Sequence, residues 1–95
     1  MKKIEIIEAV CREFEVAQVD LRVKGRKPIQ QVSDARCMLV YIFDKRRVAY
    51  SVEVQRMLGS SEGGYRAMLR RANERVTSDA VFRHHLANIN EALGN

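Results

Sequence analysis

The sequence predicts an all-α domain of five to six helices. Apolar residues recur at helical spacing along most of the chain, and no alternation typical of a β-strand lasts long enough to compete. The length of 95 residues suits one domain, residues 1–95, with a single core. No internal repeat or low-complexity tract suggests another architecture.

The first predicted helix runs from Lys2 to Glu15, and Ile6 is expected at the edge of its apolar face. That face consists of Ile4, Ile7, Cys11 and Phe14, with Val10 beside it. A second, shorter helix is predicted from Val16 to Val23, with Val16, Val19 and Leu21 facing inward.

A central helix is predicted from Asp34 to about Lys45, after a break at Gly25 and Pro28. Ser33 is expected to cap it, and acidic Asp34 in its first turn favours the helix dipole. Its apolar residues are Ala35, Met38, Leu39, Ile42 and Phe43. This broad stripe is suited to the centre of a small helical bundle.

A short helix is predicted from Ser51 to Leu58, with Ser51 as its cap. Gly59 is expected to end it, because glycine adopts the left-handed conformation without steric cost. Ser60 or Ser61 is expected to cap the next helix, which runs to about Val76. Its buried stripe consists of Tyr65, Leu69, Ala72 and Val76. A short helix, a tight turn and a basic longer helix are typical of a helix-turn-helix. An ordinary helical hairpin with a solvated charged face fits this segment equally well.

The last predicted helix is capped by Thr77 or Ser78. Its apolar residues Phe82, Leu86, Ile89 and Leu93 follow helical spacing. The centres of the apolar stripes predict four core residues: Leu39, Ile42, Leu69 and Leu86.

Charge is distributed unevenly along the chain. Residues 1–20 carry a net charge of −2, residues 21–47 a net of +6, residues 48–76 a net of +2, and the remainder −1. Clustered lysine and arginine can displace counterions from a phosphate backbone, so the basic middle suggests a surface that binds a polyanion.

Basic side chains in two segments are candidates for that surface. Lys24, Arg26 and Lys27 lie within four residues, and no acidic residue interrupts the chain between Asp20 and Asp34. Such an arm can contact phosphates or a minor groove beside a recognition helix. The cluster Lys45–Arg47 fits DNA contact and stabilisation of a helix C-terminus equally well.

Several classes of function are excluded. Cys11 and Cys37 lack CxxC spacing, and His84-His85 is distant in sequence, so no metal site is expected. No nucleophile–base arrangement or carboxylate pair indicates an enzyme, and no cofactor or small-molecule substrate is expected. The N-terminus does not resemble a signal peptide, and no apolar run of 18 residues could span a membrane. We therefore expect a cytoplasmic protein.

The order of the motifs resembles the C-terminal DNA-binding domain of the bacterial replication initiator DnaA, over about residues 4–76. Asp20-Leu21 matches a pair that ends the second helix in that family, and Glu53-Val54 matches the Glu-Ile pair of the first helix-turn-helix element. The basic loop, an arginine early in the central helix (Arg36) and the turn glycine follow in the family's order. The resemblance implies a helix-turn-helix fold and double-stranded DNA as partner. Association into a homo-oligomer stays open, because the sequence does not determine the oligomeric state.

The family's specificity signature is not retained. After the turn glycine the family has Gly-Arg-Asp-His and two small hydroxyl residues, whereas residues 60–65 are Ser-Ser-Glu-Gly-Gly-Tyr. Only Glu62 keeps the chemical character of its counterpart, so recognition of the initiator's DNA box does not carry over. The chain also contains no Walker A sequence for ATP binding.

The residue pattern and the resemblance together predict a set of DNA contacts. These residues are Lys24, Arg26, Lys27, Arg36, Ser60, Ser61, Glu62, Gly64, Arg66 and Arg70. Arg66 is nearest the start of its helix among the arginines and is expected to read bases, whereas Arg71 and Arg75 are expected to be solvated or paired with acids. Gly63-Gly64 either permits close approach of DNA or reflects loss of DNA reading. The alternative function is a degenerate copy of the fold that mediates protein association.

Overall fold

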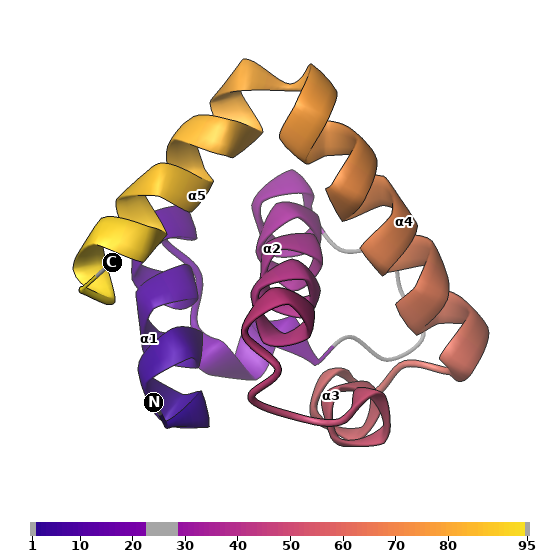
Figure 1. Ribbon diagram of the computed structural model, residues 1–95. Helices are drawn as coiled ribbons and strands as arrows, with labels where there is room; N and C mark the ends of the chain where they lie inside the picture. The colour runs from indigo at the N-terminus through magenta and orange to yellow at the C-terminus, as the bar shows by residue number, and fades with distance from the viewer. Residues whose placement is uncertain (1, 23–28, 95) are drawn as a thin grey trace.

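The computed structural model describes residues 2–22 and 29–94, and these contain only helices and short loops (Figure 1). The elements are α1 (Lys3–Phe14), the 3₁₀ helix η1 (Gln18–Leu21), α2 (Gln30–Arg46), α3 (Ser51–Leu58), α4 (Glu62–Ser78) and α5 (Ala80–Ala92). The all-α prediction is confirmed.

Helix α2 occupies the centre, and α1, α3, α4 and η1 all pack against it. Its four consecutive residues Cys37–Val40 are all buried. Successive residues of an α-helix lie about 100° apart, so these four cover most of the circumference. Because α2 is enclosed on nearly all sides, the remaining helices are positioned relative to it.

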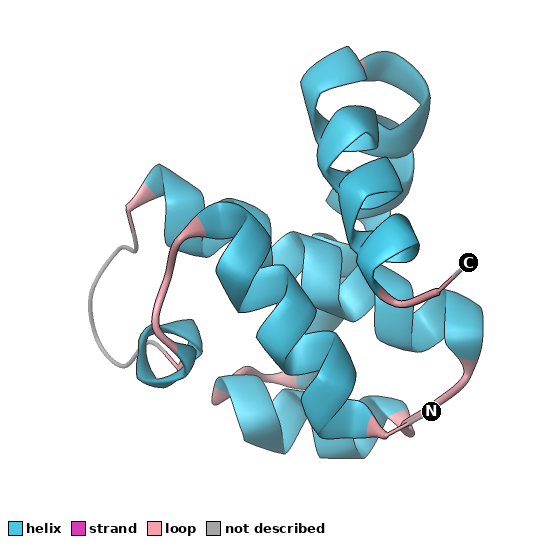
Figure 2. Cartoon of the chain, turned by 90° about the vertical axis from the view of Figure 1, so that its left-hand side faces the viewer, coloured by secondary structure: helices cyan, strands magenta, loops and turns pink. Residues whose placement is uncertain are grey.

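The other helices surround α2. In Figure 1, α1 and α5 lie on the left, α4 lies on the right, and α3 lies below α2. Figure 2 views the molecule from the side of α1 and α5. The shared core includes the predicted residues Leu39 and Ile42, whereas Leu69 and Leu86 are only partly buried. The core prediction is therefore wrong for these last two.

The buried face of α1 differs from the prediction. Ile6 is fully buried and Ile4 is 43% exposed, because α1 packs against both α2 and α5 and buries a wider face than one stripe. The predicted second α-helix is also wrong, since only η1 forms among its described residues and Val19 is 79% exposed. The Asp20 carboxylate accepts a hydrogen bond from the Ala17 amide at 3.3 Å, a local turn bond that competes with helix formation.

Three helix starts differ from the prediction. Helix α3 begins at Ser51, so Ser51 is its first residue and Tyr50 occupies the cap position. Helix α2 begins at Gln30, so Ser33 lies inside it rather than capping it. Asp34 accepts a hydrogen bond from Gln30 at 2.7 Å and also pairs with Arg75 of α4 at 2.6 Å. Helix α5 is capped by Asp79, whose carboxylate accepts from the Phe82 amide at 3.1 Å, so neither Thr77 nor Ser78 is the cap.

A polar contact joins α1 to α5. The Glu13 carboxylate lies 2.7 Å from His85 Nδ1 and accepts a hydrogen bond from the Asn88 amide at 2.9 Å. The His85 ring lies against Phe14, with ring centroids 4.7 Å apart. Burial raises the pKa of the Glu13 carboxyl, but the hydrogen bonds from Asn88 and His85 outweigh that effect and lower the pKa overall.

This contact predicts a dependence of stability on acid pH. The folded-state pKa of Glu13 is depressed, so its contribution is present above the unfolded-state pKa of about 4.3 and is lost as pH falls through the folded-state value. Chemical denaturation of the protein and of Glu13→Gln should give a difference in unfolding free energy at pH 7 that shrinks by pH 3. A difference that is constant between these pH values would contradict the assignment.

Candidate nucleic-acid interface

The junction between α3 and α4 is a tight three-residue turn. Gly59 has φ 64°, in the left-handed region, and the Gly59 and Ser60 amides donate to the carbonyls of Arg56 and Gln55 at 3.3 and 2.9 Å. These bonds satisfy the last carbonyls of α3. Ser61 then caps α4, because its hydroxyl accepts from the Gly64 amide at 3.0 Å. The predicted end of the first helix and the cap of the second are confirmed.

Helix α4 presents an apolar face to the core and an arginine face to solvent. Tyr65, Met68 and Ala72 are buried, and α4 packs against α2. Met68 takes the place expected for Leu69, which is only partly buried. Arg66 and Arg70 are exposed on the opposite side, as the helical spacing indicates.

Glu62 and Arg66 form an ion pair within this exposed face. Arg66 Nη2 lies 2.9 Å from Glu62 Oε1, and the side chains are 75% and 68% exposed. Such an exposed pair one turn apart contributes only about 0.3–0.5 kcal/mol. The Arg66 guanidinium can therefore exchange this partner for another acceptor at little cost.

The two glycines at the start of α4 differ in their surroundings. A Cβ atom added to Gly63 would meet no atom within 4 Å, whereas one added to Gly64 would lie 3.3 Å from the Ser61 hydroxyl oxygen. Neither glycine has a positive φ, so the backbone conformation does not require them. The hydroxyl of Ser60, in the preceding turn, is buried without a hydrogen-bond partner. The first turn of α4 thus offers a bare backbone surface.

Arg36 joins two parts of the chain through backbone carbonyls. Its Nη1 donates to the carbonyl of Leu21 at 2.8 Å and to that of Leu58 at 3.3 Å. The guanidinium is half-buried, and burial lowers its pKa. Arg36 therefore ties the end of η1 to the end of α3.

Lys24, Arg26 and Lys27 lie outside the described residues. Arg22, the first cation of that basic segment, is described, and its side chain lies beside the turn. A Cβ atom added to Gly59 would lie 3.1 Å from Arg22 Cγ. Arg22 was not among the residues predicted to contact DNA, although its position at the start of the basic run could have indicated it.

Arg71 and Arg75 were predicted to be solvated or paired with acidic residues. Arg75 pairs with Asp34 and with Asp79, at 2.6 and 3.1 Å, and its guanidinium lies 4.3 Å from the centre of the Phe82 ring. Arg75 thus fixes α4 against α2 and the start of α5, as expected for a paired residue. Arg71 is exposed.

Metal-binding and membrane-spanning features are not found in residues 2–22 and 29–94. No group of three or more His, Cys, Asp or Glu side chains in these ranges could hold a metal ion. Among the same residues, no helix has both the length and the apolar character needed to cross a membrane.

Comparison with protein-family models, with curated proteins and with solved structures finds no match to this chain.

Proposed function

We propose that the protein binds double-stranded DNA, with α3, the turn at residues 59–61 and α4 acting as a helix-turn-helix. The observation that carries the proposal is the exposed arginine face of α4, opposite its buried face, with Arg22 of the basic segment beside the turn. In this motif the second helix enters the major groove with its N-terminal part. Lys24, Arg26 and Lys27 would then contact phosphates or the minor groove next to it.

The residues proposed to contact DNA divide into three groups. Arg66 and Arg70 contact base edges or phosphates. Ser60, Ser61, Glu62 and Gly64 form the surface at the start of α4, to which Ser60 contributes its backbone because its hydroxyl is buried. Arg36, whose Nη1 donates to the carbonyls of Leu21 and Leu58, supports the interface mainly by holding the end of η1 near the end of α3. The resemblance to the replication initiator's domain supports this arrangement.

A gel-shift titration on random-sequence duplex DNA at low salt tests the proposal. Retardation that weakens steeply as salt is raised is expected, because phosphate contacts release counterions. Absence of retardation at protein concentrations that saturate other basic DNA-binding domains would contradict it.

Arg66→Ala is expected to reduce preference for a site selected from random duplexes. An arginine that bonds guanine O6 and N7 contributes about 1–3 kcal/mol of discrimination. Affinities of the unaltered protein and the variant are measured at one salt concentration, on the selected site and on a scrambled duplex. Arg71→Ala is the control, since Arg71 is an exposed arginine of the same helix outside the proposed contact face.

Two outcomes of that experiment would overturn parts of the proposal. If Arg66→Ala weakens both duplexes equally, Arg66 contacts only phosphates. The initiator's own box is expected to bind no better than the scrambled duplex, because the residues that recognise it are missing. A clear preference for that box would contradict our interpretation of residues 60–65.

Protein association is the second candidate function, and one observation favours it. A groove of about 380 Å³ lies between α1, η1 and α3, lined by apolar residues including Ile7, Leu21 and Met57. Val19, which is 79% exposed, forms part of its rim. Self-association in sedimentation experiments, together with a negative gel shift, would favour this function.

A further inference from the structure

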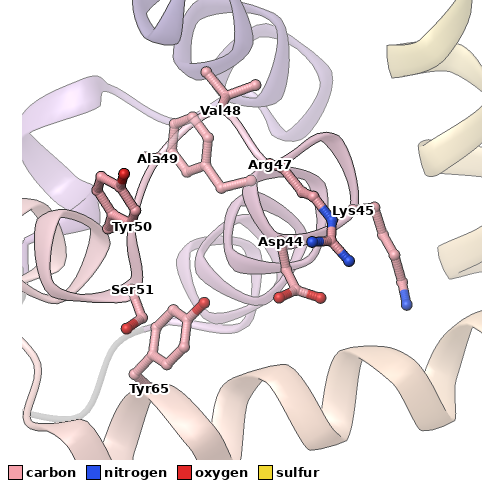
Figure 3. Close-up of a pocket in the computed structure, with 9 residues that line it drawn as sticks. Asp44, Lys45, Arg47, Val48, Ala49, Tyr50, Ser51 and Tyr65 are labelled. Carbon is pink, nitrogen blue, oxygen red and sulfur yellow. The ribbon is translucent and has the colours of Figure 1, made fainter.

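An open pocket of about 690 Å³ lies where the end of α2 and residues 47–50 meet the start of α3 and one side chain of α4 (Figure 3). Phe43, Val48 and Ala49 give it an apolar part, and charged and hydroxyl groups complete its lining. Its volume falls within the range of small-molecule sites, about 300–1,000 Å³. None of these lining residues belongs to the set of proposed DNA contacts.

Tyr65 is the most buried polar group of this pocket. It is only 7% exposed, and its hydroxyl points into the pocket (Figure 3). No hydrogen bond to this hydroxyl is found among the described residues. Burial raises the pKa of the phenol, and the negative charge of Asp44 raises it further, so the hydroxyl stays protonated at neutral pH. It is therefore an unused hydrogen-bond donor.

Asp44 and Arg47 extend toward the same space as the Tyr65 hydroxyl (Figure 3). Within the described part of the chain, no ion pair joins their two side chains. Arg47 directly follows α2 and has φ 53°, a left-handed conformation that glycine usually supplies. Because arginine occupies this position instead of glycine, a guanidinium is available at the pocket. The Arg47 and Tyr65 donors and the Asp44 carboxylate thus share one part of the pocket (Figure 3).

The chemistry of these groups restricts the ligand. A phosphate or a carboxylate alone would leave the Asp44 carboxylate without a donor, so a ligand that uses the whole pocket needs hydrogen-bond donors beside its acceptors. Guanine has two adjacent donors, N1–H and the N2 amino group, which a carboxylate can accept together. It also has two adjacent acceptors, O6 and N7, which arginine can bond together. Among the bases, guanine offers both pairs.

We propose that this pocket binds the base of a free guanine nucleotide. Asp44 accepts from N1–H and N2–H, while Arg47 and the Tyr65 hydroxyl donate to O6 and N7. Tyr50, at the rim and 82% exposed, offers a ring on which the base can stack. The Lys45 ammonium lies over the Tyr41 ring, 5.4 Å from its centre, so only the base is assigned to the pocket.

Titration calorimetry with three nucleotides, without DNA, tests the assignment. GMP is expected to bind. IMP lacks the N2 amino group and should bind at least about tenfold more weakly, and AMP should not bind measurably. Ribose 5-phosphate is the control for attraction of the phosphate alone. Equal binding of GMP, IMP and AMP, or no binding of GMP, would overturn the proposal. Tighter binding of a guanine-containing single-stranded oligonucleotide than of GMP would overturn its assignment to a free nucleotide.

Two variants locate the site. Asp44→Asn is expected to abolish the preference for GMP over IMP. Tyr65→Phe keeps the buried ring and is expected to weaken the binding of GMP. Glu8→Gln, a change of an exposed acid on α1, is the matched control and should leave GMP binding unchanged. Circular dichroism melting verifies folding of each. Retained selectivity in folded Asp44→Asn would contradict the proposal. Because DNA is absent, failure here is separate from failure of DNA binding.

Discussion

Replacing Phe82 by alanine is expected to lower the free energy of unfolding by about 3–5 kcal/mol, as for other fully buried phenylalanines. The side chain is completely inaccessible to solvent, and the Arg75 guanidinium lies over its ring. Small domains have total stabilities of about 5–15 kcal/mol, so this variant should be close to unfolding. Denaturant titration of both proteins measures the difference.

Two matched variants control this experiment. Phe82→Leu retains most of the apolar volume and should cost much less than Phe82→Ala. Leu69→Ala, at a partly buried position of α4, should likewise fall below the range expected for a full core position. If Leu69→Ala destabilises as much as Phe82→Ala, the burial of α4 described above is incorrect.

Replacing Lys24, Arg26 and Lys27 together by alanine should produce the largest change in DNA binding. Each phosphate contact removed lowers the slope of log K against log salt by about 0.9, so a loss of roughly 2–3 is expected. Affinity for any duplex should fall, because phosphate contacts carry no sequence information. Binding curves at several salt concentrations give both quantities.

A second triple variant separates this effect from a simple reduction of net charge. Lys2 precedes α1, Arg12 lies on α1 and Arg83 lies on α5. Arg83 donates to the carbonyls of Val76 and Thr77, at the opposite end of α4 from the turn proposed to enter the groove. Replacement of these three basic residues by alanine removes the same charge and should change the slope much less. An unchanged slope in the Lys24/Arg26/Lys27 variant would mean that these residues do not contact phosphates and contribute only to solubility.

The apolar spacing of the sequence predicts helix ends best where a single residue type marks the end. Gly59 ends α3 where the sequence indicates, because a left-handed position strongly favours glycine and few other residues compete. The start of α5 was missed because Thr77, Ser78 and Asp79 are three adjacent candidate caps, and the one that caps the helix, Asp79, also pairs with Arg75. The start of α2 was missed because its N-cap, Ile29, makes no side-chain hydrogen bond and so leaves no capping signal in the sequence.

Burial on the outer helices was harder to predict than burial on α2. Ile6 is buried because α1 packs against two other α-helices, α2 and α5, and the number of neighbouring helices cannot be obtained from the period of one helix. Among the candidate site residues, exposure of Arg66 and Arg70 followed from spacing alone. The bonds of Arg36 to the carbonyls of Leu21 and Leu58 join positions 15 and 22 residues away, which local patterns do not reveal.

The enclosure of α2 also determines how the domain opens. Helices α1, α3 and α4 cover different parts of its surface, so removal of one exposes apolar side chains that the others cannot reach. Amide protons of α2 can then exchange with solvent only when the whole domain unfolds, while the ends of outer helices exchange through local fraying. A proteolytic fragment lacking one of these three helices would therefore retain no stable remainder.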